Sequence, residues 1–141
     1  MEFIEVYAVN NDTDKFSLVL EKDSYNYYMM NVLDYLIGNT DRHWGNWGFL
    51  VDNKTNTLLK LHPLMDFNKA FTSYDGISGA MCLTTKETMT QMQAAIEAVH
   101  QIGLNQTAEI QESWFYDKKV KEMFFKRLDV LRKANDERAK S

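Results

Sequence analysis

The chain has 141 residues, of which 45% are hydrophobic, 13% aromatic and 26% charged, a composition typical of one globular domain with a single core. Its 16 basic and 20 acidic residues give a net charge of −4, so we expect no direct nucleic-acid binding, which normally requires a basic excess. The one cysteine, Cys82, excludes an internal disulfide and favours a reducing, cytoplasmic location. No apolar run approaches the roughly 20 residues that span a bilayer, so we expect no membrane insertion.

We predict one mainly helical domain of the α+β class over residues 1–141, because the chain shows no repeat, low-complexity tract or flexible linker. Its beginning carries only weak patterns. Short apolar runs at 3–9 and 16–20 flank a turn-rich stretch, so residues 1–24 are expected to form a loosely extended segment.

The first strong helical pattern begins at Tyr25. From there to Ile37, apolar residues recur at the spacing of one helix face. Asp23 or Ser24 can cap the start of this helix by accepting a hydrogen bond from a free backbone N–H, and Gly38 can supply a left-handed stop.

A small β-hairpin is predicted after this helix. Residues 39–46 form a polar loop, and two short apolar runs at 47–51 and 58–61 then flank a turn rich in Asn, Asp and Thr. Pro63 ends the second run, which places Asp66 just beyond the hairpin.

The remainder of the chain, residues 84–141, is predicted to be helical. Thr84 and Glu87 match the spacing of a capping box, and apolar residues at helical spacing continue to Gly103. A further helix opens near Asp117 and carries apolar residues at the same spacing.

Three polar residues around the hairpin form a candidate site. Asp41 and Asn46 lie five residues apart in the loop, and Asp66 follows the hairpin, which returns the chain close to its start. One amide and one carboxylate are hard oxygen ligands that suit Mg²⁺ and leave room for phosphate oxygens. Asp41 then stays free to accept a hydroxyl proton, as in the division of roles at a kinase site.

These residues resemble known kinase motifs. Asp41-Arg42-His43-x-x-Asn46, followed by Asp66-Phe67-Asn68, resembles the signature of the phosphoinositide-kinase-like superfamily. The longer string Leu36–Phe49 resembles more closely the HipA-type serine/threonine kinases of bacteria, which are the toxin halves of toxin–antitoxin pairs. The resemblance covers about residues 25–71, which would form the catalytic core.

The resemblance implies a role for each matching position. Asp41 would be the catalytic base, Asn46 and Asp66 would hold the Mg²⁺ of Mg·ATP, and His43 would support the loop. The reaction implied is transfer of the γ-phosphoryl group of ATP to a serine or threonine hydroxyl of a protein. A lipid acceptor stays open from the shorter signature, but the longer string favours protein.

The parts of a kinase that hold the ATP phosphates have no counterpart in the sequence. None of the six glycines forms G-x-G-x-x-G, and only 40 residues precede Asp41, too few for an N-terminal lobe. We therefore expect the C-terminal lobe of a HipA-like kinase, a fragment or split half with little activity alone. Its partner would be the chain with the missing lobe or an antitoxin-like protein. The alternative is a degenerate, non-catalytic lobe that binds proteins.

Simpler interpretations of these residues stay open. Asp41 and Asn46 are residue types that favour turns, and His43 as a lone histidine is more often structural than a proton shuttle. Trp44 and Trp47 flank Asn46 and either stack on a base or anchor the loop to the core.

Zinc and thiol chemistry are not expected. The three histidines and Cys82 lack the paired spacing of a structural zinc site. Cys82 lies between Met81 and Leu83, so we expect it to be buried and inert as a nucleophile.

Overall fold

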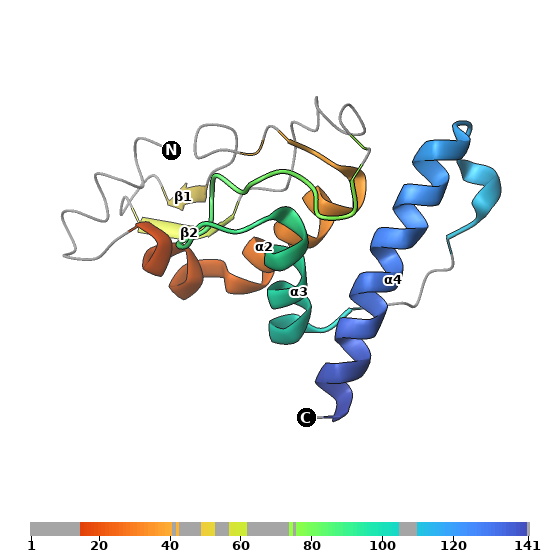
Figure 1. The fold of residues 1–141 in the computed structure, drawn as a ribbon. Helices are drawn as coiled ribbons and strands as arrows, with labels where there is room; N and C mark the ends of the chain where they lie inside the picture. Colours follow the sequence, from red (N-terminus) through yellow and green to blue (C-terminus); the bar gives the residue numbers. More distant parts are fainter. Residues whose placement is uncertain are drawn as a thin grey trace.

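The computed structural model describes residues 15–40, 42, 49–52, 57–61, 74, 76–104 and 110–140. In this part of the chain the fold is mainly helical, which confirms the mainly helical character that the sequence predicts. The elements follow in the order α2, β1, β2, α3, η1 and α4, with the three α-helices packed together (Figure 1).

Helix α2 spans Lys15–Ile37 and is kinked at Asp23, whose backbone angles (φ −161°, ψ 67°) are not helical. The Asp23 carboxylate accepts hydrogen bonds from the backbone and side-chain nitrogens of Asn26, at 3.3 and 2.8 Å. This is the geometry of a helix N-cap, so Asp23 begins a second helical segment, as the sequence predicts.

The segment before the kink corrects the sequence prediction. Residues 16–20 are helical rather than extended, so α2 crosses the predicted boundary between residues 24 and 25. Leu18 and Val19 are both buried there. A short apolar run that is buried has no periodicity to distinguish a helix from a strand, which explains the error.

The end of α2 agrees with the prediction. Gly38 adopts a left-handed conformation (φ 65°), and its N–H donates to the carbonyl of Tyr35 at 3.2 Å. The N–H of Asn39 donates to the carbonyl of Asp34 at 2.9 Å. These two bonds form a Schellman motif, which satisfies carbonyls that the helix end leaves without intrahelical partners.

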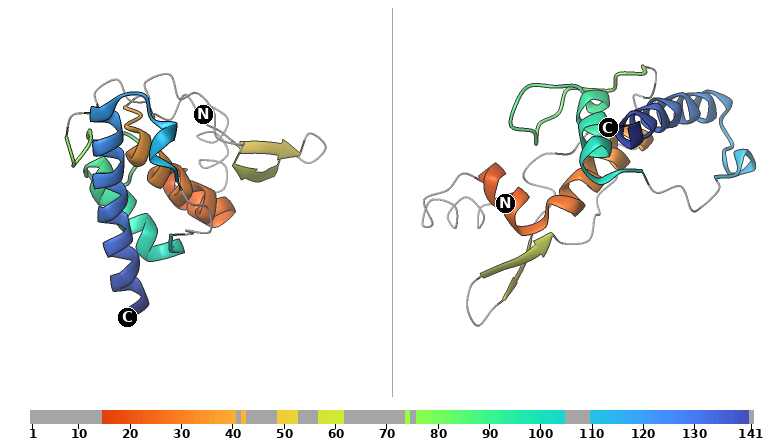
Figure 2. Two further views of the ribbon diagram at one scale, coloured as in Figure 1. Left: turned by 90° about the vertical axis from the view of Figure 1, so that its right-hand side faces the viewer. Right: turned by 90° about the horizontal axis from the view of Figure 1, so that it is seen from below.

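Strands β1 (Phe49–Asp52) and β2 (Thr57–Leu61) pair antiparallel, with Phe49 opposite Leu61 and an irregularity between Leu50 and Val51. β2 lies next to α2. The pair lies on the side of the helices away from α4 (Figure 2). The segments on either side of the pair, 43–48 and 62–73, lie outside the described residues.

Helix α3 spans Gln91–Ile102, and its start lies further along the chain than predicted. Thr90 is the N-cap: its hydroxyl accepts from the Gln93 N–H at 3.2 Å, and the Gln93 side chain accepts from the Thr90 N–H at 2.9 Å. The predicted capping box at Thr84 and Glu87 is wrong, because both residues lie in a non-helical stretch. The sequence holds more than one match to the capping-box spacing here, at 84–87 and at 90–93 among others, and the prediction rests on the first of them.

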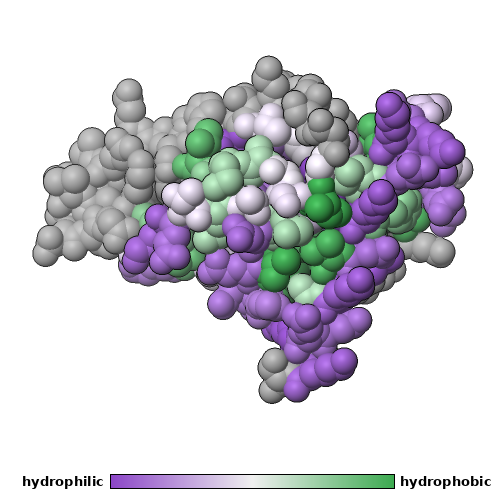
Figure 3. All heavy atoms as spheres, viewed as in Figure 1, coloured by the Kyte–Doolittle hydropathy of each residue, from purple (hydrophilic) through white to green (hydrophobic). Residues whose placement is uncertain are grey.

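Helix α4 spans Lys118–Lys140 and follows the short 3-10 helix η1 (Glu112–Trp114). The Asp117 carboxylate accepts from the Val120 N–H at 3.1 Å, which confirms that this helix opens near Asp117. In the space-filling view the exposed side of α4 is hydrophilic, whereas hydrophobic residues gather beside it over α3 (Figure 3).

The core lies where α2, α3 and α4 meet. Small residues of α3 allow the helices to approach closely, and larger aliphatic and aromatic residues of α2 and α4 fill the space between them. The buried members are Val32, Tyr35, Leu36, Tyr74, Ala95, Ala98, Val99, Phe124, Leu128, Leu131 and Ala134.

A buried arginine joins α4 to the end of α2. The Arg127 guanidinium donates to the carbonyls of Tyr35 and Gly76. It also lies over the rings of Tyr35 and Tyr74, with its central carbon 4.9 and 4.4 Å from their centroids. A cation is favourable at a helix C-terminus because the carbonyls there carry partial negative charge. The carbonyl and aromatic contacts replace much of the solvation that Arg127 loses on burial.

Gly38 provides a test of this helix end. We expect Gly38→Ala to lower the free energy of unfolding by about 2 kcal/mol, because a Cβ there needs a left-handed backbone and clashes with the Tyr74 ring. Urea denaturation measures the loss. Gly76→Ala is the matched control, since a Cβ at Gly76 meets no atom within 4 Å, and we expect a change within about 0.5 kcal/mol. Equal losses in the two variants would contradict this role of Gly38.

Candidate functional site

The residues predicted to carry chemistry, Asp41, His43, Asn46 and Asp66, lie outside the described residues. Their predicted roles therefore stay predictions. The structure does describe the chain on both sides of Asp41, up to Thr40 and again at Arg42. The contacts of Arg42 and of the residues just before Asp41 therefore define the described part of the candidate site.

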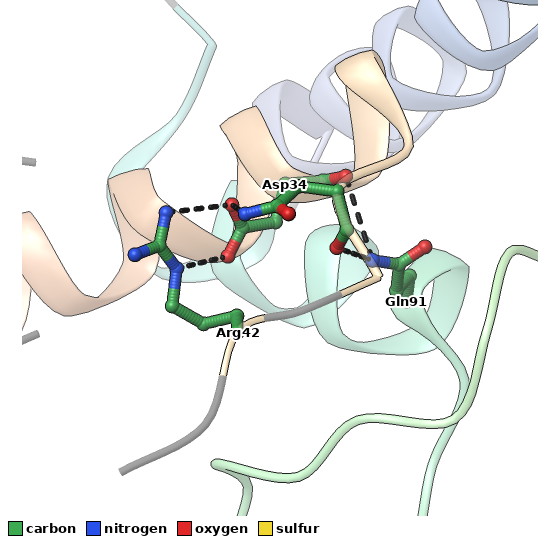
Figure 4. Close-up of polar contacts among 4 residues, drawn as sticks. Asp34, Arg42 and Gln91 are labelled. Carbon is green, nitrogen blue, oxygen red and sulfur yellow. Dashed lines mark hydrogen bonds and ion pairs between the residues drawn. The ribbon is translucent and has the colours of Figure 1, made fainter. Parts of the chain in front are cut away.

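Arg42 is anchored to α2 by a bidentate ion pair with Asp34. Its Nε lies 2.9 Å from Oδ2 of Asp34, and its Nη2 lies 3.1 Å from Oδ1 (Figure 4). Both residues are buried, with 4% of Asp34 and 6% of Arg42 exposed. The flat guanidinium matches the two carboxylate oxygens, a geometry that fixes orientation as well as distance.

Two amide side chains complete this network. Asn39 Nδ2 donates to Oδ1 of Asp34 at 3.1 Å. Gln91, the first residue of α3, donates to the carbonyl of Asn39 at 2.6 Å and approaches the carbonyl of Asp34 at 3.5 Å. The Gln91 side-chain oxygen accepts from the Ala80 N–H at 3.2 Å. The start of α3 therefore holds the end of α2 and the segment that contains Ala80.

The buried charge of Asp34 is stable only while its partners are present. Burial raises the pKa of Asp34 above its ordinary value, and the Arg42 guanidinium and the Asn39 amide oppose that rise. Removing one partner from such a pair leaves a buried charge without compensation, which costs far more than the pair contributes as a whole. Replacing either Asp34 or Arg42 alone should therefore lower the stability of the fold strongly.

A small cavity of about 20 Å³ lies beside the ion pair, lined among others by Asp34, Arg42 and Cys82. It is large enough for one water molecule and too small for a nucleotide. Cys82 is partly buried, and burial followed by the nearby Asp34 charge raises the pKa of its thiol to about 11. The thiol is thus protonated at neutral pH, in agreement with the expectation that it is a poor nucleophile.

Sequence reasoning identified Arg42 only as part of a motif and missed Asp34 and Gln91. Asp34 carried a signal, because a carboxylate in the last turn of a helix is unfavourable beside the carbonyl ends and indicates a basic partner. Gln91 carried no local signal, since its bond to Asn39 joins residues 52 positions apart.

Comparisons of the chain with protein-family models, with curated proteins and with solved structures find no match. Among the described residues, no three His, Cys, Asp or Glu side chains come together as a metal site. No helix in the described ranges is both long and apolar enough to cross a membrane.

The ion pair gives a direct stability prediction. We expect Arg42→Ala to lower the free energy of unfolding by about 3–5 kcal/mol, because it leaves the buried Asp34 carboxylate without its cation. Urea denaturation at pH 7 measures this change.

Arg132→Ala is the matched control for Arg42→Ala. Arg132 pairs with Asp129 at 3.5 Å on the exposed side of α4, with 44% and 63% of the two side chains exposed. Such pairs contribute about 0–1 kcal/mol. A loss below 1 kcal/mol in both variants would show that Arg42 does not anchor the loop.

Proposed function

We propose that the chain is the C-terminal, catalytic lobe of a HipA-like, ATP- and Mg²⁺-dependent serine/threonine kinase. The observation that carries this proposal is the ion pair that fixes Arg42 of the motif to Asp34 of α2. Arg42 of Asp41-Arg42-His43-x-x-Asn46 is not an ordinary turn residue exposed to solvent, but a buried side chain in a bidentate pair with Asp34. A loop that exists only to connect two elements does not need a buried charge beside it.

The proposed division of roles follows the donor types. Asp41, next to the anchored Arg42, accepts the proton of the acceptor hydroxyl or aligns its oxygen for attack. The amide oxygen of Asn46 and the carboxylate of Asp66 form a hard-oxygen donor set that suits Mg²⁺. When bound, Mg·ATP supplies the phosphoryl group and a cation that neutralises charge developing on its oxygens. His43 supports the loop through hydrogen bonding.

The proposal includes a partner. Phosphoryl transfer depends on positioning and on charge stabilisation, so a lobe without a phosphate-covering loop and its lysine should have little activity alone. We propose that a second chain with these groups, or an antitoxin-like protein, docks on this lobe in a bacterial cytoplasm. The acceptor is a protein hydroxyl.

A second candidate function is a non-catalytic lobe that binds proteins. The observation that favours it lies beside the anchored loop, in the segment that leads to α3. Met81 and Leu83 are large apolar residues, yet they are 51% and 59% exposed. Together with Arg42 they surround the small cavity, so apolar surface adjoins the proposed catalytic loop.

A calorimetric titration with Mg·ATP tests the proposed site. Because the phosphate-covering groups are absent from this chain, we expect it to bind Mg·ATP only weakly, through Asn46 and Asp66. We expect Asp66→Ala to abolish the heat of binding and Asp41→Ala to retain it, because Asp41 acts on the acceptor and not on the metal. Asp136→Ala, which removes the same charge from the exposed side of α4, is the control and should bind normally.

Equal heats for the chain and for Asp66→Ala would contradict the assigned metal site. The absence of heat in every protein would show that this chain does not hold Mg·ATP alone, the result expected both of a non-catalytic lobe and of a catalytic lobe whose ATP site is completed by its partner.

A further inference from the structure

A second and larger cavity, of about 170 Å³, shares Asn31 with the small cavity, but neither Asp34 nor Arg42 lines it. It is lined by residues of α2 on both sides of the kink at Asp23, by the segment 85–89 and by α3. Small-molecule sites usually measure roughly 300–1,000 Å³, so this cavity is too small for a nucleotide. A cavity of roughly 150 Å³ holds a benzene ring, so this one has room for one planar group and its stem.

Aromatic rings form the walls of this cavity. The Phe16 and Tyr27 rings lie with centroids 5.5 Å apart and planes at 87°, and Tyr27 and Tyr28 are also 5.5 Å apart, at 73°. The Tyr27 hydroxyl donates to the carbonyl of Thr84 at 2.9 Å, which fixes the orientation of the ring. Tyr27 is buried, with 2% exposed, whereas Phe16 and Tyr28 on either side of it are partly exposed and form an aromatic corner. The face of an aromatic ring attracts a cation.

Two carboxylates lie at the rim. Glu87 and Glu97 both line the cavity and are exposed. Among the described residues, neither forms an ion pair with a Lys, Arg or His. Burial is the first cause that raises the pKa of Tyr28, and the negative charge of Glu97 is the second. The Glu97 carboxylate therefore acts on the aromatic wall of the cavity. Lys86 is the one described cation at the rim, and the three charges sum to −1.

We propose that this cavity binds the side chain of an arginine from a protein partner. The aromatic corner suits the flat face of a guanidinium, and the rim carboxylates suit its N–H groups. Arginine fits better than lysine because lysine concentrates its charge in a strongly hydrated ammonium that cannot stack. The net charge of −4 on the chain adds attraction for a basic partner. The proposal is independent of kinase activity.

The test is an NMR titration of the ¹⁵N-labelled chain, without Mg²⁺ or ATP. The probes are acetylated and amidated pentapeptides in which alanines flank a central arginine, citrulline, norleucine or glutamate. We expect the arginine peptide to produce saturable shifts at the amides of Tyr28, Glu87 and Glu97. Citrulline has the shape of arginine without its charge, so we expect binding about tenfold weaker.

Charge-removing variants complete the test. We expect Glu97→Gln to weaken binding of the arginine peptide by roughly threefold to tenfold. Glu122→Gln, an equal change on α4 outside the cavity, should leave binding unchanged. Tyr28→Leu should also weaken the arginine peptide, because it removes one aromatic face.

Two results would overturn the proposal. If the norleucine peptide binds as tightly as the arginine peptide, the cavity takes an apolar side chain. If no peptide shifts the cavity amides, or the shifts lie elsewhere on the protein, the cavity is not an arginine site. Neither result bears on the titration with Mg·ATP, so failures of the two proposals are distinguishable.

Discussion

The buried ion pair between Asp34 and Arg42 is the constraint on which this end of the molecule depends. Two charges at the end of α2 leave water together, and they are stable there because the guanidinium meets both carboxylate oxygens. The left-handed turn at Gly38 reverses the chain, so that Arg42, eight positions after Asp34, reaches back to the helix. The left-handed end of α2 and the ion pair therefore act together to fix Arg42 against the helix.

Side chains from α3 and α4 also bind the end of α2. Gln91 at the start of α3 binds the carbonyl of Asn39, and Arg127 from α4 binds the carbonyl of Tyr35. Both are polar side chains buried in the interior, and both use main-chain carbonyls near the end of α2. The end of α2 is therefore bound by side chains from both of the other α-helices, which fixes its position relative to them.

Sequence patterns predicted what depends on near neighbours. The cap at Asp23, the stop at Gly38 and the opening of α4 near Asp117 all follow from local chemistry and are correct. Errors arose where local signals were ambiguous: a buried apolar run at 16–20, and competing capping boxes near Thr84 and Thr90. The contact from Gln91 to Asn39 joins distant parts of the chain and was beyond local reasoning. The predicted catalytic residues themselves lie outside the described part of the chain.

The central claim of the proposal is that Asn46 and Asp66 bind one cation. Paramagnetic broadening by Mn²⁺ in the presence of ATP, recorded for every backbone amide, tests this claim most directly. The account predicts that the amides of Asn46 and Asp66 broaden at the same Mn²⁺ concentration, and that Asn46→Ala or Asp66→Ala removes both effects. Broadening at only one of the two amides, or broadening that survives both substitutions, would contradict it.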